Sequence, residues 1–139
     1  MNPKLLKILI AILVAITITG VVAFVLVLNV FGDKKDEPLS LDKMVEYSFT
    51  TEEMNTDLQD GSFVQIQFQF MTDSEKAKKE IEQRSFQIKN EFIKQSVSLT
   101  EADFKSGLTE LESNLKTKMN ELMTEGKIID VYIINKIIQ

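Results

Sequence analysis

The chain has 139 residues and a mass of 15.9 kDa, which leaves room for one compact domain beside any membrane segment. Residues 33–139 carry 14 basic and 21 acidic side chains, a net charge of −7 that argues against a nucleic-acid partner. Cysteine, histidine and tryptophan are absent, which excludes disulfides, thiolate or imidazole metal ligands, and the Ser/His or Cys/His nucleophilic pairs. We therefore expect no enzyme activity, no metal and no cofactor.

An apolar segment at residues 8–32 contains no ionisable side chain and is long enough, at about 1.5 Å per residue, to cross a bilayer as a helix. The apolar run exceeds the roughly 7 to 15 residues typical of a signal peptide, so we interpret it as an uncleaved anchor. Lys4, Lys7 and the terminal amine precede it, which favours a cytoplasmic N-terminus. We expect a cytoplasmic stub (1–7), a single span (8–32) and an extracytoplasmic remainder.

Small side chains recur every four residues within this span, at Ala11, Ala15, Thr19 and Ala23. Such a stripe lets a second helix approach closely, so these residues are candidates for transmembrane packing. The alternative is that Ala and Thr are ordinary components of a membrane helix.

After the span, the pattern of residues 33–71 predicts a linker followed by two strands. Residues 33–45 are charged, contain Pro38 and show no sustained period, which is typical of a linker. We predict strands at residues 46–51 and 62–71, the second with Val64, Ile66, Phe68 and Phe70 on its buried face. Residues 52–61 predict an acidic turn ending in Asp60-Gly61, with a calcium loop as an alternative that the spacing disfavours.

Residues 72–97 predict one helix that begins at a capping box, Thr72 to Glu75. Its apolar residues fall on two sides, with Ala77, Ile81, Ile88 and Phe92 on one and Phe86, Ile93 and Val97 on the other. The charged positions, including Glu80 and Arg84, are interpreted as a solvated face. We expect the second apolar face to contact either another element of the domain or another subunit, which makes Phe86, Ile93 and Val97 candidate subunit contacts.

A second helix is predicted after the capping box Ser98 to Glu101, and a strand closes the chain. The helix has one apolar stripe, from Phe104 to Leu122, that favours packing on a sheet over a coiled coil, and Gly126 is expected to cap its C-terminus. Residues 127–138 are apolar on both faces, which predicts a covered or central strand. Gln139 follows the strand directly, and we expect no sorting motif there. The predicted fold class is α+β, with residues 46–139 forming the extracytoplasmic domain.

A family resemblance is carried by five short segments and the last residue: 72–77, 80–84, 120–122, 125–127, 130–132 and Gln139. These segments resemble the FliL family of flagellar basal-body-associated, single-pass membrane proteins. The resemblance covers nearly the whole chain and is strongest at the C-terminus, where an acidic-Gly-Lys turn precedes a Val-Tyr strand. A looser match lies at residues 104–107, where the family often carries a Leu and a helix-breaking Gly-Lys.

The resemblance implies a function that the periodicities alone do not. It implies a fold similar to stomatin and prohibitin domains, and a homo-oligomeric ring around the peptidoglycan-binding subunit of the flagellar stator, of the MotA/MotB type. On this hypothesis the protein supports flagellar rotation, motility and chemotaxis at the basal body, outside the cytoplasmic (inner) membrane. Two other hypotheses are a membrane-anchored ligand-binding or sensory module and a metal-dependent hydrolase using Glu52, Glu53, Asp57 and Asp60.

Overall fold

The computed structural model describes residues 2–31 and 38–139, which divide into two compact units, Met1–Pro38 and Leu39–Gln139. The first unit contains one helix, α1 (Pro3–Phe31), in which the stretch Pro3–Val27 is long and apolar enough to cross a membrane. The helix thus begins five residues before the predicted span. Gly32 and most of the charged start of the predicted linker lie outside the described residues.

The second unit is built on an antiparallel sheet whose central strand is β3 (Phe63–Thr72). Two short strands, β1 (Ser48–Thr50) and β2 (Met54–Asp57), pair with successive stretches of β3 along one edge. The last strand, β4 (Ile128–Ile138), pairs with β3 along the other edge. The fold class is therefore α+β, as predicted, with a long apolar helix before a small mixed domain.

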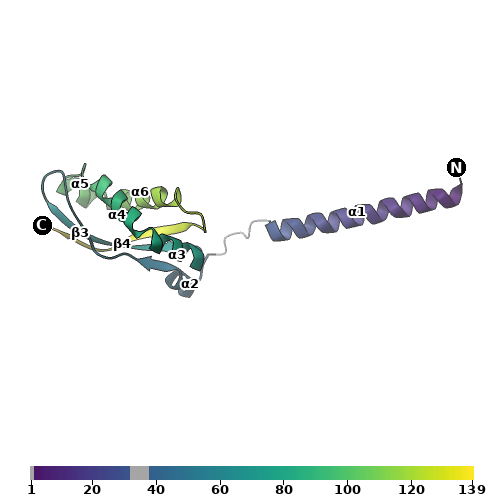
Figure 1. Cartoon of the computed structure of the whole chain (residues 1–139), viewed down its shortest axis with the longest axis horizontal. Helices are drawn as coiled ribbons and strands as arrows, with labels where there is room; N and C mark the ends of the chain where they lie inside the picture. Colours follow the sequence, from purple (N-terminus) through teal and green to yellow (C-terminus); the bar gives the residue numbers. More distant parts are fainter. Residues whose placement is uncertain (1, 32–37) are drawn as a thin grey trace. The chain divides into compact units, whose positions relative to one another are not determined.

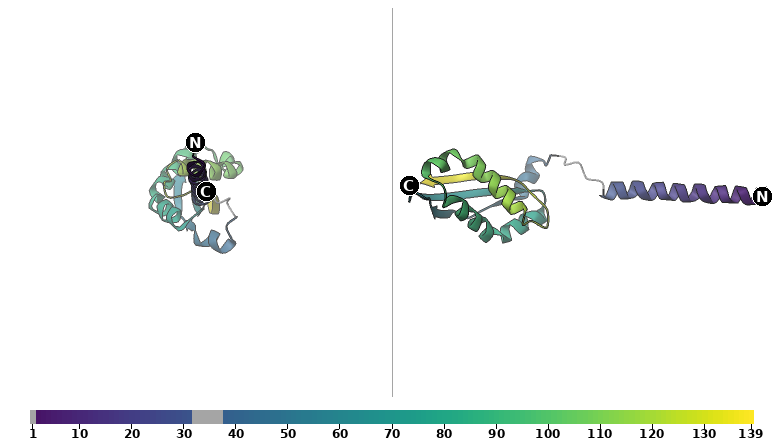
Figure 2. Two further views of the ribbon diagram at one scale, coloured as in Figure 1. Left: turned by 90° about the vertical axis from the view of Figure 1, so that its right-hand side faces the viewer. Right: turned by 90° about the horizontal axis from the view of Figure 1, so that it is seen from above.

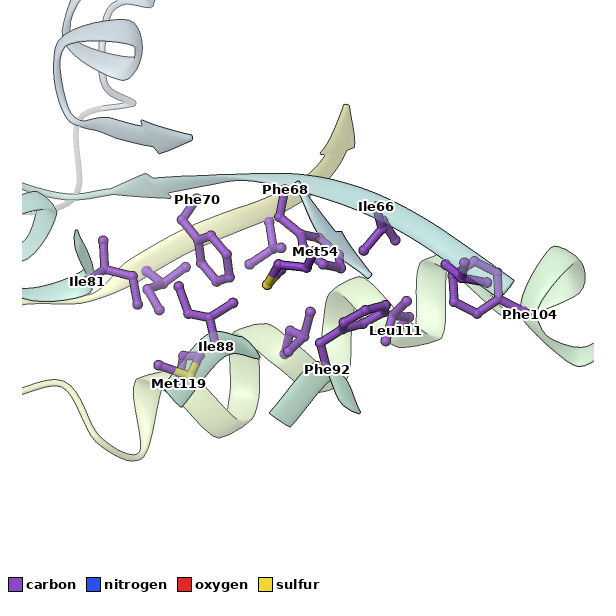
Figure 3. Close-up of a cluster of buried hydrophobic side chains, with 14 of the residues drawn as sticks. Met54, Ile66, Phe68, Phe70, Ile81, Ile88, Phe92, Phe104, Leu111 and Met119 are labelled. Atoms are coloured by element: carbon purple, nitrogen blue, oxygen red, sulfur yellow. The ribbon is translucent and has the colours of Figure 1, made fainter. Parts of the chain in front are cut away.

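Helices α3 (Glu75–Gln83), α4 (Ser85–Ser96), α5 (Glu101–Ser106) and α6 (Leu108–Asn120) supply the buried side chains opposite the sheet. Figure 1 shows α4, α5 and α6 on one side of β3 and β4, and Figure 2 shows helices lying over the strands when the molecule is seen from above. The core forms between these two layers, where Ile66, Phe68 and Phe70 point toward Phe92 and Leu111 (Figure 3). The predicted alternation of buried residues along β3 is confirmed.

The single helix predicted over residues 72–97 is instead two helices that meet at Arg84. Arg84 is both the C-cap of α3 and the N-cap of α4, with φ −89° and ψ 11°. The capping box at Thr72 is also wrong: Ser74 is the N-cap and accepts a hydrogen bond from the N–H of Ala77 (3.2 Å), whereas Thr72 is buried at the end of β3. The predicted buried stripe on this segment is confirmed.

The second predicted helix is also divided in two. Thr100 and Asp103 form the capping box of α5, two residues beyond the predicted one, and Gly107 separates α5 from α6. Gly126 does not cap α6, which ends at Asn120. Its φ of 144° and its position against the first turn of α3 require a residue without a side chain.

The segment between the apolar helix and β3 has more regular structure than its sequence suggests. The C-terminal part of the predicted linker forms α2 (Leu41–Glu46), and the predicted strand at 46–51 is reduced to β1. The predicted acidic turn contains β2, because Met54 and Leu58 supply two buried anchors within it. Asp60-Gly61 does form a turn, with Gly61 at φ 82°.

The prediction of a covered or central β4 is wrong, because β4 pairs with β3 on one side only and lies at the edge of the sheet. Register shifts opposite Gln67/Phe68 and Met71/Thr72 interrupt its alternation, so that Val131, Ile133 and Ile138 lie on the core side. Ile129, Tyr132, Ile134 and Ile137 remain exposed on β4.

Candidate functional site: an exposed helix face and its setting

The predicted contact residues Phe86, Ile93 and Val97 lie at the two ends and along one side of α4. Phe86 is 70% exposed and Val97 is 55% exposed, whereas Ile93 is half-buried. Spacings of seven and four residues place these three side chains on one face of an α-helix, and we call this set the Phe86 face. No other described element of the domain covers Phe86 or Val97. Whether a second subunit covers them stays a prediction.

Phe86 lines two hollows in the protein surface. One, of about 760 Å³, is lined by side chains of α3 and α4 together with Thr124 and Glu125. The other, of about 360 Å³, lies between α4 and the β1–β2 edge and includes Glu52, Glu53 and Lys89. Aromatic side chains are enriched in protein–protein interfaces, so an exposed Phe at this position is a candidate contact residue.

Below the Phe86 face, the carboxylate of Glu80 joins α3 to the loop before β4. Glu80 accepts hydrogen bonds from the N–H groups of Thr124 (2.9 Å) and Glu125 (2.7 Å) and from the hydroxyl of Thr124 (3.1 Å). Arg84 donates to the same carboxylate through Nε (3.0 Å) and Nη2 (2.8 Å). This cluster holds the bend between α3 and α4, and therefore the start of the Phe86 face, against the rest of the domain.

The surroundings of Glu80 stabilise its charged form. Burial by itself would raise the pKa of Glu80, but the N–H groups of Glu125 and Thr124 and the Arg84 guanidinium lower this pKa from 4.5 to about 2. Glu80 and Arg84 are therefore structural, and the prediction that they belong to a solvated face is wrong. Two features of the sequence could have indicated this structural role: the (i, i+4) spacing of Glu80 and Arg84, and the Glu-Gly-Lys turn at residues 125–127.

Asp60 has structural partners within the domain. Asp60 accepts hydrogen bonds from the N–H of Glu101 (2.8 Å) at the start of α5 and from the N–H of Ser62 (3.0 Å), and both lower its pKa. Within residues 2–31 and 38–139, no group of three or more acidic side chains is arranged to hold a metal ion. The calcium loop and the metal-dependent hydrolase therefore gain no support from the described residues.

The small-residue stripe of α1 (Ala11, Ala15, Thr19, Ala23) lies on an exposed helix. The hydroxyl of Thr19 donates to the carbonyl of Ala15 (2.8 Å), so it is satisfied without a partner helix. Packing of a second helix on this stripe stays a prediction.

The architecture is that of a small α+β domain that follows one apolar helix long enough to cross a membrane. Residues 47–139 match the family described as flagellar basal body-associated protein FliL. The flagellar protein FliL of Bacillus subtilis (strain 168) is 32% identical over 104 residues, which cover 73% of this chain and 74% of that protein. The chain belongs to the FliL family, a family of non-enzymatic flagellar proteins with a basal-body-associated role in motility.

Proposed function

We propose that this protein forms a ring of identical subunits on the outer side of the cytoplasmic membrane, around the peptidoglycan-binding subunit of the flagellar stator. In this proposal α1 anchors each subunit, and the domain of residues 39–139 makes the contacts, with the stomatin-like and prohibitin-like fold that the family resemblance implies. The ring supports rotation by holding the plug or linker region of the stator in its open, engaged state.

The observation that carries the proposal is the exposure of the Phe86 face on a domain whose core is well packed. Phe86 and Val97 occupy positions that a monomeric domain has no need to make apolar, since polar side chains would fit the same exposed sites. A repeated contact between copies would remove this apolar surface from water at every position of a ring.

The alternative, a ligand-binding or sensory module, requires a concave apolar pocket. The larger hollow beside Phe86 is lined mainly by charged and amide side chains, namely Lys76, Lys79, Glu80, Gln83, Arg84, Gln87 and Glu125. Such a lining is a poor match to the apolar pocket of a small-molecule site, so the structural contact remains the better proposal.

Crosslinking in motile cells tests the proposal. The tagged full-length chain should copurify with stator subunits after crosslinking, and its deletion should reduce swimming speed or the fraction of motile cells. Full motility after deletion, together with no recovery of stator subunits, would contradict the stator contact. Recovery of stator subunits by a chain that stays monomeric would support association and contradict the ring.

A further inference from the structure

The short helix α2 leaves most of its apolar side in water. An α-helix turns by about 100° per residue, so the three apolar residues of α2, Leu41, Met44 and Val45, fall on one side and its three charged residues on the other. We call these three apolar residues the α2 apolar face. Leu41 is 74% exposed and Val45 is 64% exposed, whereas Met44 is half-buried. A helix of a folded domain ordinarily buries its apolar side against the core, and α2 does not.

This helix also lacks the features that usually stabilise a short helix. It has six residues, none of them is buried, and its N-cap Ser40 makes no side-chain capping bond. Helices shorter than about 12 to 15 residues are marginal in water unless packing supports them. A surface that covered the α2 apolar face would supply the packing that the core of the domain does not.

Polar contacts fix the C-terminal end of α2 to the rest of the domain. The Nζ of Lys78, on α3, donates a hydrogen bond to the carbonyl of Glu46 (2.8 Å). The hydroxyl of Thr72, at the end of β3, donates to the carbonyl of Tyr47 (2.8 Å). These bonds come from two different elements, so they hold the helix in one orientation, and the α2 apolar face points in one direction from the domain.

The position of α2 in the chain ties it to the membrane anchor. Leu41 follows Phe31, the last residue of α1, by ten residues, which reach at most about 35 Å when fully extended. When α1 is inserted, the covalent chain therefore keeps α2 within that reach of the bilayer. Within the domain, α2 precedes the pair of Ser48 with Met71 at one end of β3, whereas Gln139 bonds to Phe63 at the other end. Figure 1 accordingly shows α2 and the C-terminus at opposite ends of the domain.

The size and charge of the α2 apolar face suit a lipid surface better than a protein. A stable protein–protein contact buries about 800 Å² on each partner, and three side chains of a six-residue helix fall well short of that area. A bilayer interface accepts apolar side chains without a matching concave surface. The charged side of α2 carries Asp42 and Glu46 against Lys43, which pairs with Glu46 (3.0 Å). Attraction to anionic headgroups is therefore absent from α2, and apolar burial is the available driving force.

We infer that α2 docks on the surface of the membrane, with Leu41 and Val45 inserted at the level of the lipid headgroups. The inference rests on the proposed anchoring by α1 and not on the ring. Insertion of two side chains is weak alone, but the link to α1 makes the contact intramolecular and raises the effective concentration of the surface. Docking sets the height and tilt of the domain, so that neighbouring subunits present their Phe86 faces at one level above the membrane.

Fluorescence of the full-length chain in lipid vesicles tests this inference, and the chain has no native cysteine to interfere. Val45→Cys carries an environment-sensitive nitrobenzoxadiazole label, and the vesicles contain phosphatidylethanolamine and phosphatidylglycerol. The emission should shift to the blue, and lipids with a spin label near the headgroup should quench it. The matched control is Lys43→Cys, on the charged side of the same helix, where quenching should be several-fold weaker. The difference should not depend on the phosphatidylglycerol content.

A second variant and the remaining outcomes separate the docking from its alternatives. Adding Leu41→Asp to the labelled Val45→Cys chain should abolish the quenching, because a carboxylate opposes insertion. A blue shift without quenching by lipid would mean that a second copy covers α2, and would overturn the inference, as would equal quenching at positions 43 and 45 or water-like emission at both. Release of the chain from the vesicles by an alkaline wash would overturn the anchoring and the docking together. An inserted chain that is quenched at position 45 but forms no multimers would support the docking and contradict the ring alone.

Discussion

At the scale of single residues, Glu80 is the most consequential charged group of the domain. It is 8% exposed, and its carboxylate is held by two backbone N–H groups, one hydroxyl and the Arg84 guanidinium. A pKa of about 2 in the folded protein, against an ordinary 4.5, corresponds to roughly 3 kcal/mol of stabilisation of the charged form. Because the folded pKa is the lower one, this stabilisation is complete above pH of about 4.5 and is lost as the pH falls toward 2.

Glu80→Gln in a fragment of residues 39–139 should therefore lower the free energy of unfolding at pH 7 by about 2 to 3 kcal/mol. The difference between variant and parent should shrink between pH 4.5 and pH 2. Urea denaturation at several pH values measures both effects. Glu82→Gln, at an exposed site in the same helix, is the control and should change little. A difference that stays constant from pH 7 to pH 2 would contradict the assigned role of the charge.

The two glycines with positive φ offer a matched pair of substitutions. A Cβ at Gly126 would lie 2.9 Å from the Cβ of Ala77 and closer still to the carboxylate of Asp73, whereas a Cβ at Gly61 would meet no heavy atom within 4 Å. Gly61→Ala should cost about 1 kcal/mol through backbone strain alone. Gly126→Ala should cost about 2 kcal/mol more, because the start of α3 must move. Thermal melts of both variants compare these costs, and equal costs would contradict close packing at Gly126.

At the scale of elements, the register shifts in β4 decide which of its side chains enter the core. Strict alternation would group Ile134 and Ile138 on one face and Val131 and Ile133 on the other. The shift opposite Gln67/Phe68 instead places Ile133 and Ile138 on the core side and leaves Ile134 exposed. A bulge adds one unpaired residue, and the alternation changes phase there.

Val131→Asp should therefore unfold the domain or cost several kcal/mol, because Val131 is buried opposite Phe70 and an unpaired carboxylate would enter the core. Ile134→Asp should leave the melting temperature nearly unchanged, because Ile134 is exposed. Circular-dichroism melts of the two variants in the 39–139 fragment make the comparison. Strong destabilisation by Ile134→Asp would contradict the assigned register.

The elements predictable from the sequence are those in which local pattern and tertiary burial agree. The alternation of β3 is an example, because one face is buried along the whole strand. The bend at Arg84 was not predictable from periodicity, because it depends on bonds between Glu80 and a loop more than 40 residues away. The edge position of β4 was missed because an apolar run does not distinguish burial within a subunit from contact between subunits.

At the scale of the whole molecule, the first expectation is topological. We expect the domain to lie outside the cytoplasm, because the short basic stub favours a cytoplasmic N-terminus and one apolar helix follows it. Ser40→Cys and Ser113→Cys, both at exposed positions, should react with a membrane-impermeant maleimide in cells whose cytoplasmic membrane is intact. Cysteine in place of Asn2 is the control and should react only after lysis. Labelling of positions 40 and 113 only after lysis would contradict the proposed orientation.

The family was predictable from the sequence, because segments along the whole chain resemble FliL proteins in the same order. The subunit contacts were not predictable in the same way. The two-faced pattern of residues 72–97 indicated Phe86, Ile93 and Val97, and the structure leaves two of these exposed and the third half-buried. The exposed apolar residues of β4 were not recognised from the sequence, because they were assigned to a covered strand. Surfaces formed by chain pairing depend on register, which a single sequence does not specify.

The central claim is that the Phe86 face joins subunits, and the most direct measurement compares assembly with folding in one variant. Phe86→Ser combined with Val97→Ser changes two exposed side chains, so the melting temperature of the 39–139 fragment should stay within a few degrees of the parent. Each lost contact should weaken assembly by about 1.5 to 3 kcal/mol per side chain. The full-length variant should therefore remain in the membrane at normal abundance, lose its high-order crosslinked species and reduce motility. A variant that assembles and supports swimming like the parent would contradict the claim.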